Sequence, residues 1–267
     1  MKLVASITAV IATFALTASG NVTKGRPWGY RQNSNMVHPS QWADNWESCG
    51  NARQSPINIV STAKSVKVKS LPLRFSGRCH EYNLSAPQEP LEADVVRGNC
   101  TVSVKGAAYK MAQFHLHAPS EHTLNGEHLD GEVHFVHFNE DRSAILVVGV
   151  FLKISAKSDE WLGPVLDALE QVNSTERSSA MMVNLRSYSF LVKKTCRTGG
   201  VYNYPGSLTT PPCAATVDWW VVRQPLQISA VDFGRLHQDL VEYDITDNGN
   251  NARPTQPLNG RVVIHYH

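Results

Sequence analysis

The chain has few charged residues and no block of basic ones. Charged side chains make up 18% of its 267 residues, and the formal net charge is +2. Proteins that bind the phosphate backbone of nucleic acids carry clustered lysine and arginine. The composition therefore gives no electrostatic reason to expect a nucleic-acid partner. A disordered chain is also excluded, because 42% of the residues are hydrophobic and six are Trp.

Long hydrophobic runs are missing beyond residue 20. The longest is Ala144 to Leu152, nine residues, which suits a buried strand and is too short for a membrane helix. With no hydrophobic tail either, we expect no membrane or lipid-linked anchor. The first 20 residues differ: Lys2 precedes an apolar run, and Ala18-Ser-Gly20 supplies small residues. This order predicts a secretory signal peptide over 1–20, a domain over 21–267, and a secreted protein, extracellular or, in a bacterium, periplasmic.

The cysteines form no C-x-x-C pair, so a zinc ribbon is not expected. An exported chain favours disulfides, and the five cysteines are Cys49, Cys79, Cys100, Cys196 and Cys213. Because five is odd, at least one is free or joined to a second chain, and a homodimer through an unpaired cysteine stays open. Four N-x-Ser/Thr sequons, at Asn21, Asn83, Asn99 and Asn173, are consistent with a secreted glycoprotein.

Internal repeats and linker-like stretches are absent, and apolar residues mostly recur with period two, which is typical of strands. We expect strands at Thr101–Val104, Met111–His117, Glu132–Phe138, Ile145–Leu152 and Thr216–Val222. Helices are expected at Ser158–Val172 and Ala230–Leu240. The polar, Pro-containing stretch Ser85–Asn99 is interpreted as a surface loop. The pattern predicts one β-rich domain with a few peripheral helices.

Three of the eleven histidines have the spacing of metal ligands. His115 and His117 are two apart on one expected strand, so their side chains share a face. His134 lies on a second strand, and antiparallel pairing would bring it beside them. Three neutral imidazoles with an open fourth position suit a catalytic zinc rather than a structural one.

Acceptors for the outer nitrogens of these imidazoles are also present. Ligating histidines usually donate their second N–H to a carboxylate, amide or carbonyl. Gln113 precedes His115 by two residues, and Glu132 precedes His134 by two, each on the same face as its histidine. Glu121 and His122 lie between the strands and could extend the hydrogen bonding. The H-E-x-x-H motif of zinc proteases is missing, which disfavours that class of hydrolase.

Together, these and further motifs closely resemble the α-class carbonic anhydrases. The matching segments follow the family's order over nearly the whole expected mature chain: Trp28-Gly-Tyr30, Gln54-Ser-Pro-Ile-Asn58, Gln113-Phe-His-Leu-His117, Ser120-Glu-His122, Glu132-Val-His134, Ser207-Leu-Thr-Thr-Pro-Pro212 and Asn251-Ala-Arg-Pro-Thr-Gln-Pro-Leu258. The resemblance implies a mainly β single domain on a large, mostly antiparallel twisted sheet with short peripheral helices. It also implies the reversible hydration of CO2 to bicarbonate and a proton by a zinc-bound hydroxide, with sulfonamides and anions as inhibitors.

The resemblance assigns roles to individual residues. His115, His117 and His134 become the zinc ligands, supported by Gln113, Glu132 and a backbone carbonyl near Asn251, with His122 alongside. Thr209 matches the family's gatekeeper and Glu121 its partner. Because ionised Glu121 only accepts, the Thr209 hydroxyl must donate to it and can only accept from the hydroxide. The implied substrate contacts are Thr209, Thr210, Leu208, Val136, Val147, Val217 and Trp219.

The chain departs from the family in its cysteines and in its proton shuttle. The resemblance implies a disulfide between Cys49 and Cys213, whereas Cys79, Cys100 and Cys196 have no counterpart. Many members also place a shuttle histidine at the start of the strand before the ligand strand. Asn99 or Cys100 takes that place here, so we expect no histidine shuttle and slower turnover at low buffer concentration.

Relatives that have lost zinc ligands act as binding or storage proteins, so a catalytically weak binding or matrix protein of the same fold is the alternative. The three histidines, Glu121 and Thr209 are all intact, which favours the enzyme.

Overall fold

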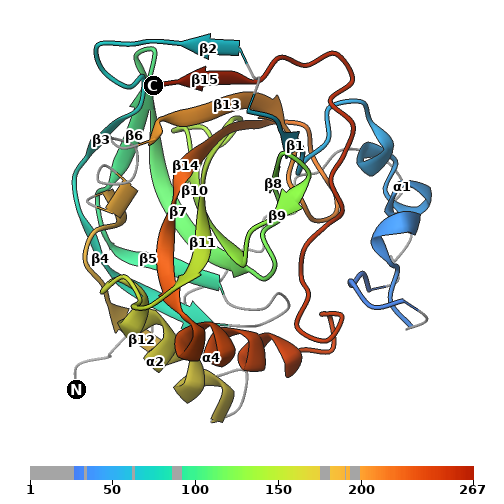
Figure 1. Ribbon diagram of the computed structural model, residues 1–267, viewed down its shortest axis with the longest axis vertical. Helices are drawn as coiled ribbons and strands as arrows, with labels where there is room; N and C mark the ends of the chain where they lie inside the picture. Colours follow the sequence, from blue (N-terminus) through green and yellow to red (C-terminus); the bar gives the residue numbers. More distant parts are fainter. Residues whose placement is uncertain are drawn as a thin grey trace, which may run out of the picture.

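The computed structural model describes residues 27–32, 35–61, 64–85, 92–174, 181–189, 191, 192 and 199–267. The expected signal peptide, Asn21 and Cys196 lie outside these ranges. A twelve-stranded sheet dominates the described part (Figure 1). Its path runs β12 (Met181–Asn184), β4 (Cys79–Ser85), β5 (Glu92–Gly98), β7 (Ala107–His117), β10 (Gly131–Phe138), β11 (Ile145–Ser155), β14 (Val217–Ser229), β13 (Val201–Gly206), β15 (Ile264–Tyr266) and β2 (Lys64–Val66).

Short elements complete the architecture. Off the main path, β3 (Arg74–Ser76) pairs with β6 (Thr101–Val104), which pairs with β7. A small second sheet contains β1 (Asn58–Ile59), β8 (Thr123–Leu124) and β9 (Glu127–His128). Neighbours in the large sheet are antiparallel except for the parallel pairs β11–β14 and β15–β2. The expected fold class, mainly β with few helices, is confirmed.

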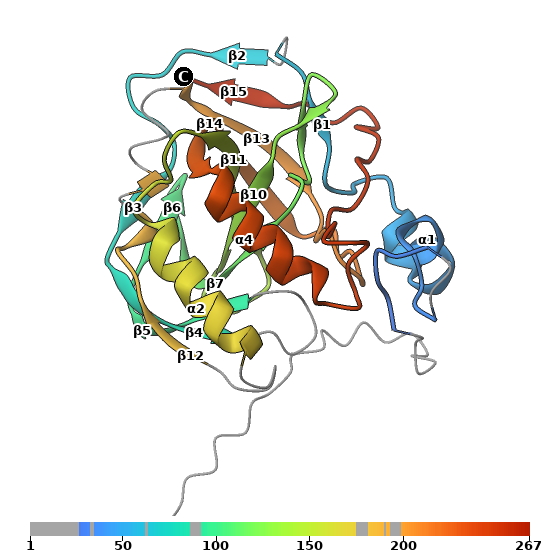
Figure 2. The same ribbon diagram turned by 60° about the horizontal axis from the view of Figure 1, so that its bottom comes forward.

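Helices cover one face of the large sheet. Figure 2 shows α2 (Leu162–Ser174) and α4 (Ala230–Val241) side by side across it. Their apolar residues Leu166 and Leu236 belong to the same buried cluster as Phe114, Leu116 and Phe135 from the strands. Side chains alternate along a strand, so His115, His117 and His134 point to the opposite face. That face carries a second apolar cluster, which includes Val136, Val147 and Trp219.

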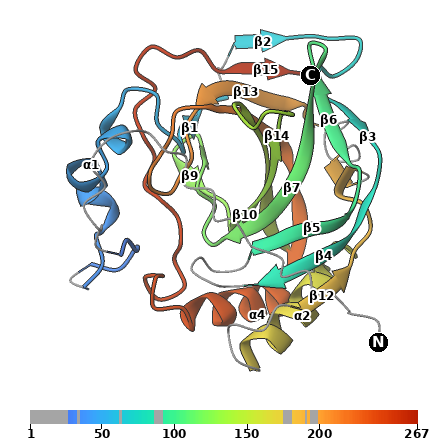
Figure 3. The same cartoon turned by 180° about the vertical axis from the view of Figure 1, so that it is seen from behind.

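An N-terminal segment packs beside the sheet, as Figures 1 and 3 show from opposite sides. It contains two 3-10 turns, Pro39–Gln41 and Glu47–Gly50, and the one-turn helix α1 (Trp42–Asn45). Trp42 and Tyr30 bury their rings there together with Cys49 and Cys213. Among the described residues, no helix combines the length and the apolar character needed to cross a membrane.

All five expected strands and both expected helices are present. Strand β6 has the expected ends, and the other elements differ at one or both ends. Helix α2 begins at Leu162, not at Ser158. The preceding residues are held in another conformation, because Asp159 donates its N–H to Gln227 O at 2.8 Å and Ser158 Oγ accepts from Ser229 N at 2.7 Å.

The prediction of a surface loop over Ser85–Asn99 is wrong for two of its parts. Ser85 closes β4, and Glu92–Gly98 forms β5, which lies between β4 and β7. Ala93 is fully buried, and Val95 packs against the helix-side core. The polar Glu92 and Asp94 pair with His115 and Gln113 along β7. These polar residues conceal the period-two pattern of a half-buried strand.

Candidate metal centre

The three histidines converge because β7 and β10 pair in the expected antiparallel register. His134 lies directly opposite His115 in the ladder, and His117 follows on the same face. The three ring centroids lie 4.6 to 5.2 Å apart. One ligand atom from each ring falls within 4.8 Å of the other two. This spacing is compact enough for a single ion to reach all three nitrogens.

Each ring has an acceptor on the side away from this centre. His115 Nδ1 lies 2.9 Å from Gln113 Oε1, and His117 Nδ1 lies 2.8 Å from the carbonyl oxygen of Asn251. His134 Nε2 lies 3.0 Å from Glu132 Oε1. Donation to these acceptors leaves the lone pairs of His115 Nε2, His117 Nε2 and His134 Nδ1 for a ligand. Sequence reasoning named all three acceptors.

The protonation of the rings also suits a metal ion. Burial, reinforced by the other two imidazoles, holds the pKa of His115 well below its usual value. Burial likewise lowers the pKa of His134, although Glu132 opposes the shift. The buried Nε2 of His117 has no hydrogen-bond partner among the described residues. Neutral imidazoles with an inward lone pair are the form that binds Zn²⁺, so the residues present fit the ion.

Glu132 is the acceptor shared by two histidines. Its Oε1 lies 2.8 Å from His122 Nδ1, and its Oε2 accepts the backbone N–H of His122 at 2.9 Å. Burial alone would raise the pKa of Glu132. The attraction of His122 and His134 and their hydrogen bonds outweigh burial and hold that pKa well below its usual value. Glu132 is therefore an ionised acceptor at the back of the centre.

Glu121 is fully buried and lies against the same centre. Its Oε1 accepts the backbone N–H of Arg253 at 2.9 Å, while its Oε2 lies 3.5 Å from His117 Nε2 and 3.8 Å from His134 Nδ1. Thr209 is buried too. No hydrogen bond between Thr209 and Glu121 occurs among the described residues, so their joint role stays a prediction.

An apolar wall adjoins the histidines on the same face of the sheet. Val136 is paired with Val147 across β10 and β11, and Val147 with Trp219 across β11 and β14. The rings of Trp219 and His134 have centroids 4.8 Å apart. The structure places Val217 and Leu208 in or against this cluster as well, with the half-exposed Thr210 two residues beyond Leu208. The five apolar residues expected to contact substrate are thus brought together.

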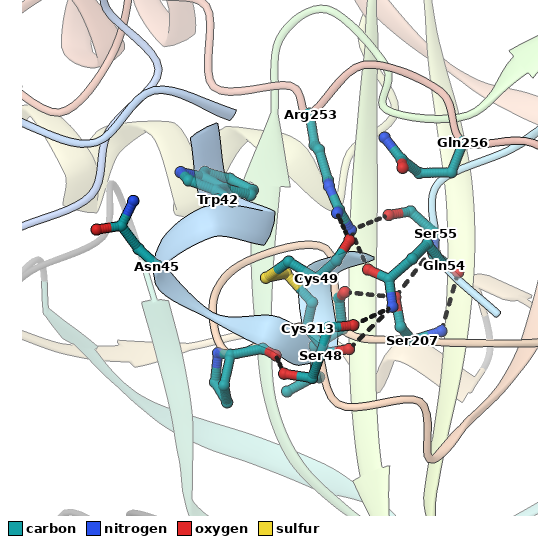
Figure 4. The surroundings of a disulfide bond; sticks show 12 residues. Trp42, Asn45, Ser48, Cys49, Gln54, Ser55, Ser207, Cys213, Arg253 and Gln256 are labelled. Atoms are coloured by element: carbon teal, nitrogen blue, oxygen red, sulfur yellow. Dashed lines mark hydrogen bonds between the residues drawn. A yellow bond between two sulfur atoms is a disulfide. The ribbon is translucent and has the colours of Figure 1, made fainter. Parts of the chain in front are cut away.

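The loop that carries Thr209, residues 207–213, is called here the gatekeeper loop. The expected disulfide between Cys49 and Cys213 is present and ties this loop to the N-terminal segment (Figure 4). Gln54 Nε2 donates to Cys213 O at 3.2 Å. The buried Arg253 donates to Gln54 Oε1, to Ser55 O and to Cys49 O. The guanidinium of Arg253 therefore holds the segment that carries Cys49, and Gln54 joins that segment to Cys213.

A second disulfide joins Cys79 and Cys100. This corrects the expectation that Cys100 stands in the cleft at the shuttle position. Cys100 is fully buried in the helix-side core, where its Sγ also contacts Met111. The other candidate, Asn99, uses its Oδ1 to accept the backbone N–H of Arg78 at 3.1 Å. Cys196 lies outside the described residues, so a dimer through an unpaired cysteine remains a prediction.

Sequence reasoning missed His80, near the start of β4. The β4–β5 ladder shifts between Cys79 and Glu81, which makes His80 the extra residue of a bulge. Cys79 and Tyr82 are buried in the helix-side core, whereas the His80 side chain is 53% exposed and lies 3.7 Å from Glu81. An imidazole therefore projects away from the core at the strand two places from β7. The signal in the sequence was the set of apolar residues around it, Cys79, Tyr82 and Leu84, which share one face of the strand once the extra residue of the bulge is allowed for.

Comparison with known proteins supports what the geometry indicates. The model of the eukaryotic-type carbonic anhydrase family matches residues 37–267. Alpha carbonic anhydrase 7 of Arabidopsis thaliana is 30% identical over 97% of this chain and 92% of its own length.

Two solved structures extend the comparison. The α-carbonic anhydrase of Thermovibrio ammonificans in complex with sulfanilamide has 31% identity and a TM-score of 0.71, over 90% of this chain and 99% of that one. Dioscorin in complex with ascorbate has 27% identity and a TM-score of 0.77, over 90% and 98%.

Proposed function

This chain belongs to the eukaryotic-type carbonic anhydrase family, and from that premise we propose that it catalyses the reversible hydration of CO2 with a zinc ion held by His115, His117 and His134. The observation that carries the proposal is the inward Nε2 of His117. It is buried without a hydrogen-bond partner among the described residues, beside two other inward nitrogens. Such an atom costs free energy unless something occupies the centre. Three imidazole nitrogens suit Zn²⁺.

The residues around this centre have separate tasks in the proposed reaction. When bound, zinc supplies a water of lowered pKa, as it does in carbonic anhydrases generally. Glu121 accepts a hydrogen bond from the Thr209 hydroxyl, which leaves only lone pairs on Thr209 Oγ1 to accept a hydrogen bond from the nucleophile. Val136, Val147 and Trp219 provide an apolar surface against which uncharged CO2 binds. Leu208 and Val217 extend that surface, and Thr210 borders bicarbonate.

His80 is proposed to accept the proton released by hydration. We prefer His80 to Asn99 and Cys100 as the proton acceptor. Cys100 is buried in the core, and Asn99 Oδ1 accepts the backbone N–H of Arg78. Imidazole is the side chain best suited to accept and release protons near neutral pH. Sulfonamides and anions are proposed as inhibitors. Secretion after removal of residues 1–20 is proposed from the sequence pattern.

A binding protein of the same fold is the competing interpretation. Dioscorin, which has been solved with ascorbate, is among the structural neighbours, and no hydrogen bond joins Thr209 to Glu121 among the described residues. A non-catalytic protein would keep the fold and could keep a metal ion, yet would not accelerate hydration.

Stopped-flow CO2 hydration on the zinc-loaded protein separates the two interpretations. We expect fast hydration that a chelator abolishes and added zinc restores. His115→Ala should lose it, while His38→Ala, at a half-exposed histidine, should keep it. Zinc binding without hydration would favour the binding protein. Repeating the assay across buffer concentrations tests His80, since His80→Ala should slow turnover at low buffer and approach the wild-type rate at high buffer.

A further inference from the structure

A buried chain of polar groups extends from Glu132 away from the candidate metal centre. His122 Nδ1 lies 2.8 Å from Glu132 Oε1, and His122 Nε2 lies 2.6 Å from the hydroxyl of Tyr204. The Tyr204 hydroxyl lies 2.9 Å from Ser55 Oγ. Glu132, His122, Tyr204 and Ser55 are all fully buried. Neither Tyr204 nor Ser55 was among the site residues indicated by the sequence.

Counting donors fixes the direction of every hydrogen bond in this chain. Ionised Glu132 only accepts, so His122 Nδ1 must carry the hydrogen and a neutral His122 accepts at Nε2. Tyr204 must then donate to His122. Its hydroxyl hydrogen is used there, so Ser55 donates to the Tyr204 oxygen. Burial, the largest influence, keeps the pKa of Tyr204 well above its usual value, in agreement with a protonated tyrosine.

At its Ser55 end, this series of hydrogen bonds reaches the gatekeeper loop. Ser207 donates its N–H to Ser55 Oγ at 3.1 Å, and Ser55 donates its N–H to Ser207 Oγ at 2.9 Å. Figure 4 shows these two residues facing each other beside the disulfide. Ser207 precedes Thr209 by two residues. At the other end, Glu132 Oε1 lies 3.0 Å from Nε2 of the ligand His134.

We propose that Tyr204 and Ser55 are positioning residues that couple the gatekeeper loop to His134 and thereby set the affinity of the centre for zinc. The inference rests on the proposed function, because it takes His134 as a ligand. No proton needs to move along these hydrogen bonds. Each hydroxyl holds the next group in one orientation, and the last of these groups, Glu132, fixes the tautomer and the angle of the His134 ring.

Tyr204→Phe removes a single hydroxyl and leaves the ring. The ring is nearly parallel to that of Trp219, at 7° with centroids 6.4 Å apart, so its packing has no reason to change. The variant leaves His122 Nε2 as a buried acceptor without a donor. His122 can then reorient and release Glu132. Partners of metal ligands typically change metal affinity by 10- to 100-fold. For Tyr204, two hydrogen bonds beyond the ligand's partner Glu132, we expect zinc release to be about 3- to 10-fold faster.

The test measures zinc release from the purified full chain into a chromophoric chelator, which needs no catalytic assay. Tyr202→Phe is the matched control, since Tyr202 lies on the same strand and packs on His265 instead. Faster release from Tyr204→Phe and from Ser55→Ala, with Tyr202→Phe unchanged, supports the proposal. Wild-type release rates in both Tyr204→Phe and Ser55→Ala would overturn it. A wild-type chain that binds no zinc would instead overturn the proposed function.

A double-mutant cycle separates positioning from general loosening of the fold. Glu132→Ala removes the carboxylate toward which all the hydrogen bonds point. In that background, Tyr204→Phe should no longer change the zinc release rate, because Tyr204 acts on His134 only through His122 and the missing carboxylate. If the two substitutions instead multiply their effects on release, Tyr204 acts on overall structure and the coupling is rejected.

Discussion

At the scale of single residues, the second ring nitrogen distinguishes a metal-facing histidine from a structural one. His117 satisfies Nδ1 with the carbonyl oxygen of Asn251, but its buried Nε2 has no hydrogen-bond partner among the described residues. His137 is equally buried on the opposite face of β10 and satisfies both nitrogens. Its Nδ1 lies 3.1 Å from Leu146 O and its Nε2 lies 2.5 Å from the Tyr188 hydroxyl. We infer that His137 stabilises the fold in its neutral form.

That inference predicts a pH-dependent stability. Burial lowers the pKa of His137 to about 4, whereas an unfolded histidine titrates near pH ~6.5. Below about pH 6.5 the unfolded chain therefore binds a proton that the folded one does not. Stability from this residue is complete above that pH and is lost as the pH falls toward 4, by about 3 kcal/mol in all.

Urea unfolding at pH 7.5 and pH 4.5 measures the effect of His137. His137→Gln should lower stability at pH 7.5 and lose less than the wild type between the two pH values. His38→Gln, at a half-exposed histidine, serves as the control and should follow the wild type. An identical pH slope for all three proteins would show that His137 does not contribute.

At the scale of elements, the sequence predicts the strands whose apolar residues alternate over a short range. Strands β7, β10, β11 and β14 were expected from apolar alternation, and the convergence of His115, His117 and His134 followed from it. The β5 strand was not expected, because Glu92 and Asp94 occupy its polar face and the partner that makes it a strand, β7, lies further along the chain. Thr209 and Cys213 were indicated only by the family resemblance. Tyr204 gave no signal, and Ser55 appeared only within the Gln54–Asn58 motif without a role of its own, since their roles depend on contacts between distant segments.

Strand β11 contributes to the site by having no side chain at Gly149. This glycine lies opposite His134 in the ladder, and a Cβ there would come within 2.7 Å of Glu132 Oε1. Gly149→Ala should therefore displace Glu132 from His134 and weaken zinc binding by about 10-fold or more. Equilibrium competition with a chelator measures the change.

Gly234→Ala is the control for this substitution. Gly234 lies within α4, and a Cβ there would meet no atom within 4 Å. Alanine should leave zinc affinity unchanged and raise stability by about 0.5 to 1 kcal/mol. Wild-type zinc affinity in Gly149→Ala would show that Glu132 can move without disturbing His134.

At the scale of the whole molecule, the site is assembled from segments far apart in the chain. Cys49 and Cys213 are 164 residues apart, whereas Cys79 and Cys100 are 21 apart. A disulfide restricts the unfolded chain more when it closes a longer loop. The chain-entropy model gives about 5 kcal/mol for the long loop and about 3 kcal/mol for the short one. The two disulfides also hold different parts of the fold, because only Cys49–Cys213 is attached to the gatekeeper loop.

Replacing each pair by alanine separates these two effects. Cys49→Ala with Cys213→Ala should lower the free energy of unfolding by about 2 kcal/mol more than Cys79→Ala with Cys100→Ala, measured by urea titration at one pH. The first pair should also lower kcat for CO2 hydration, because Thr209 loses its anchor at Cys213, while the second should leave kcat unchanged. Equal losses of stability would mean that native contacts outweigh loop closure. An unchanged kcat without the long-range disulfide would mean that Arg253 and Gln54 hold the gatekeeper loop on their own.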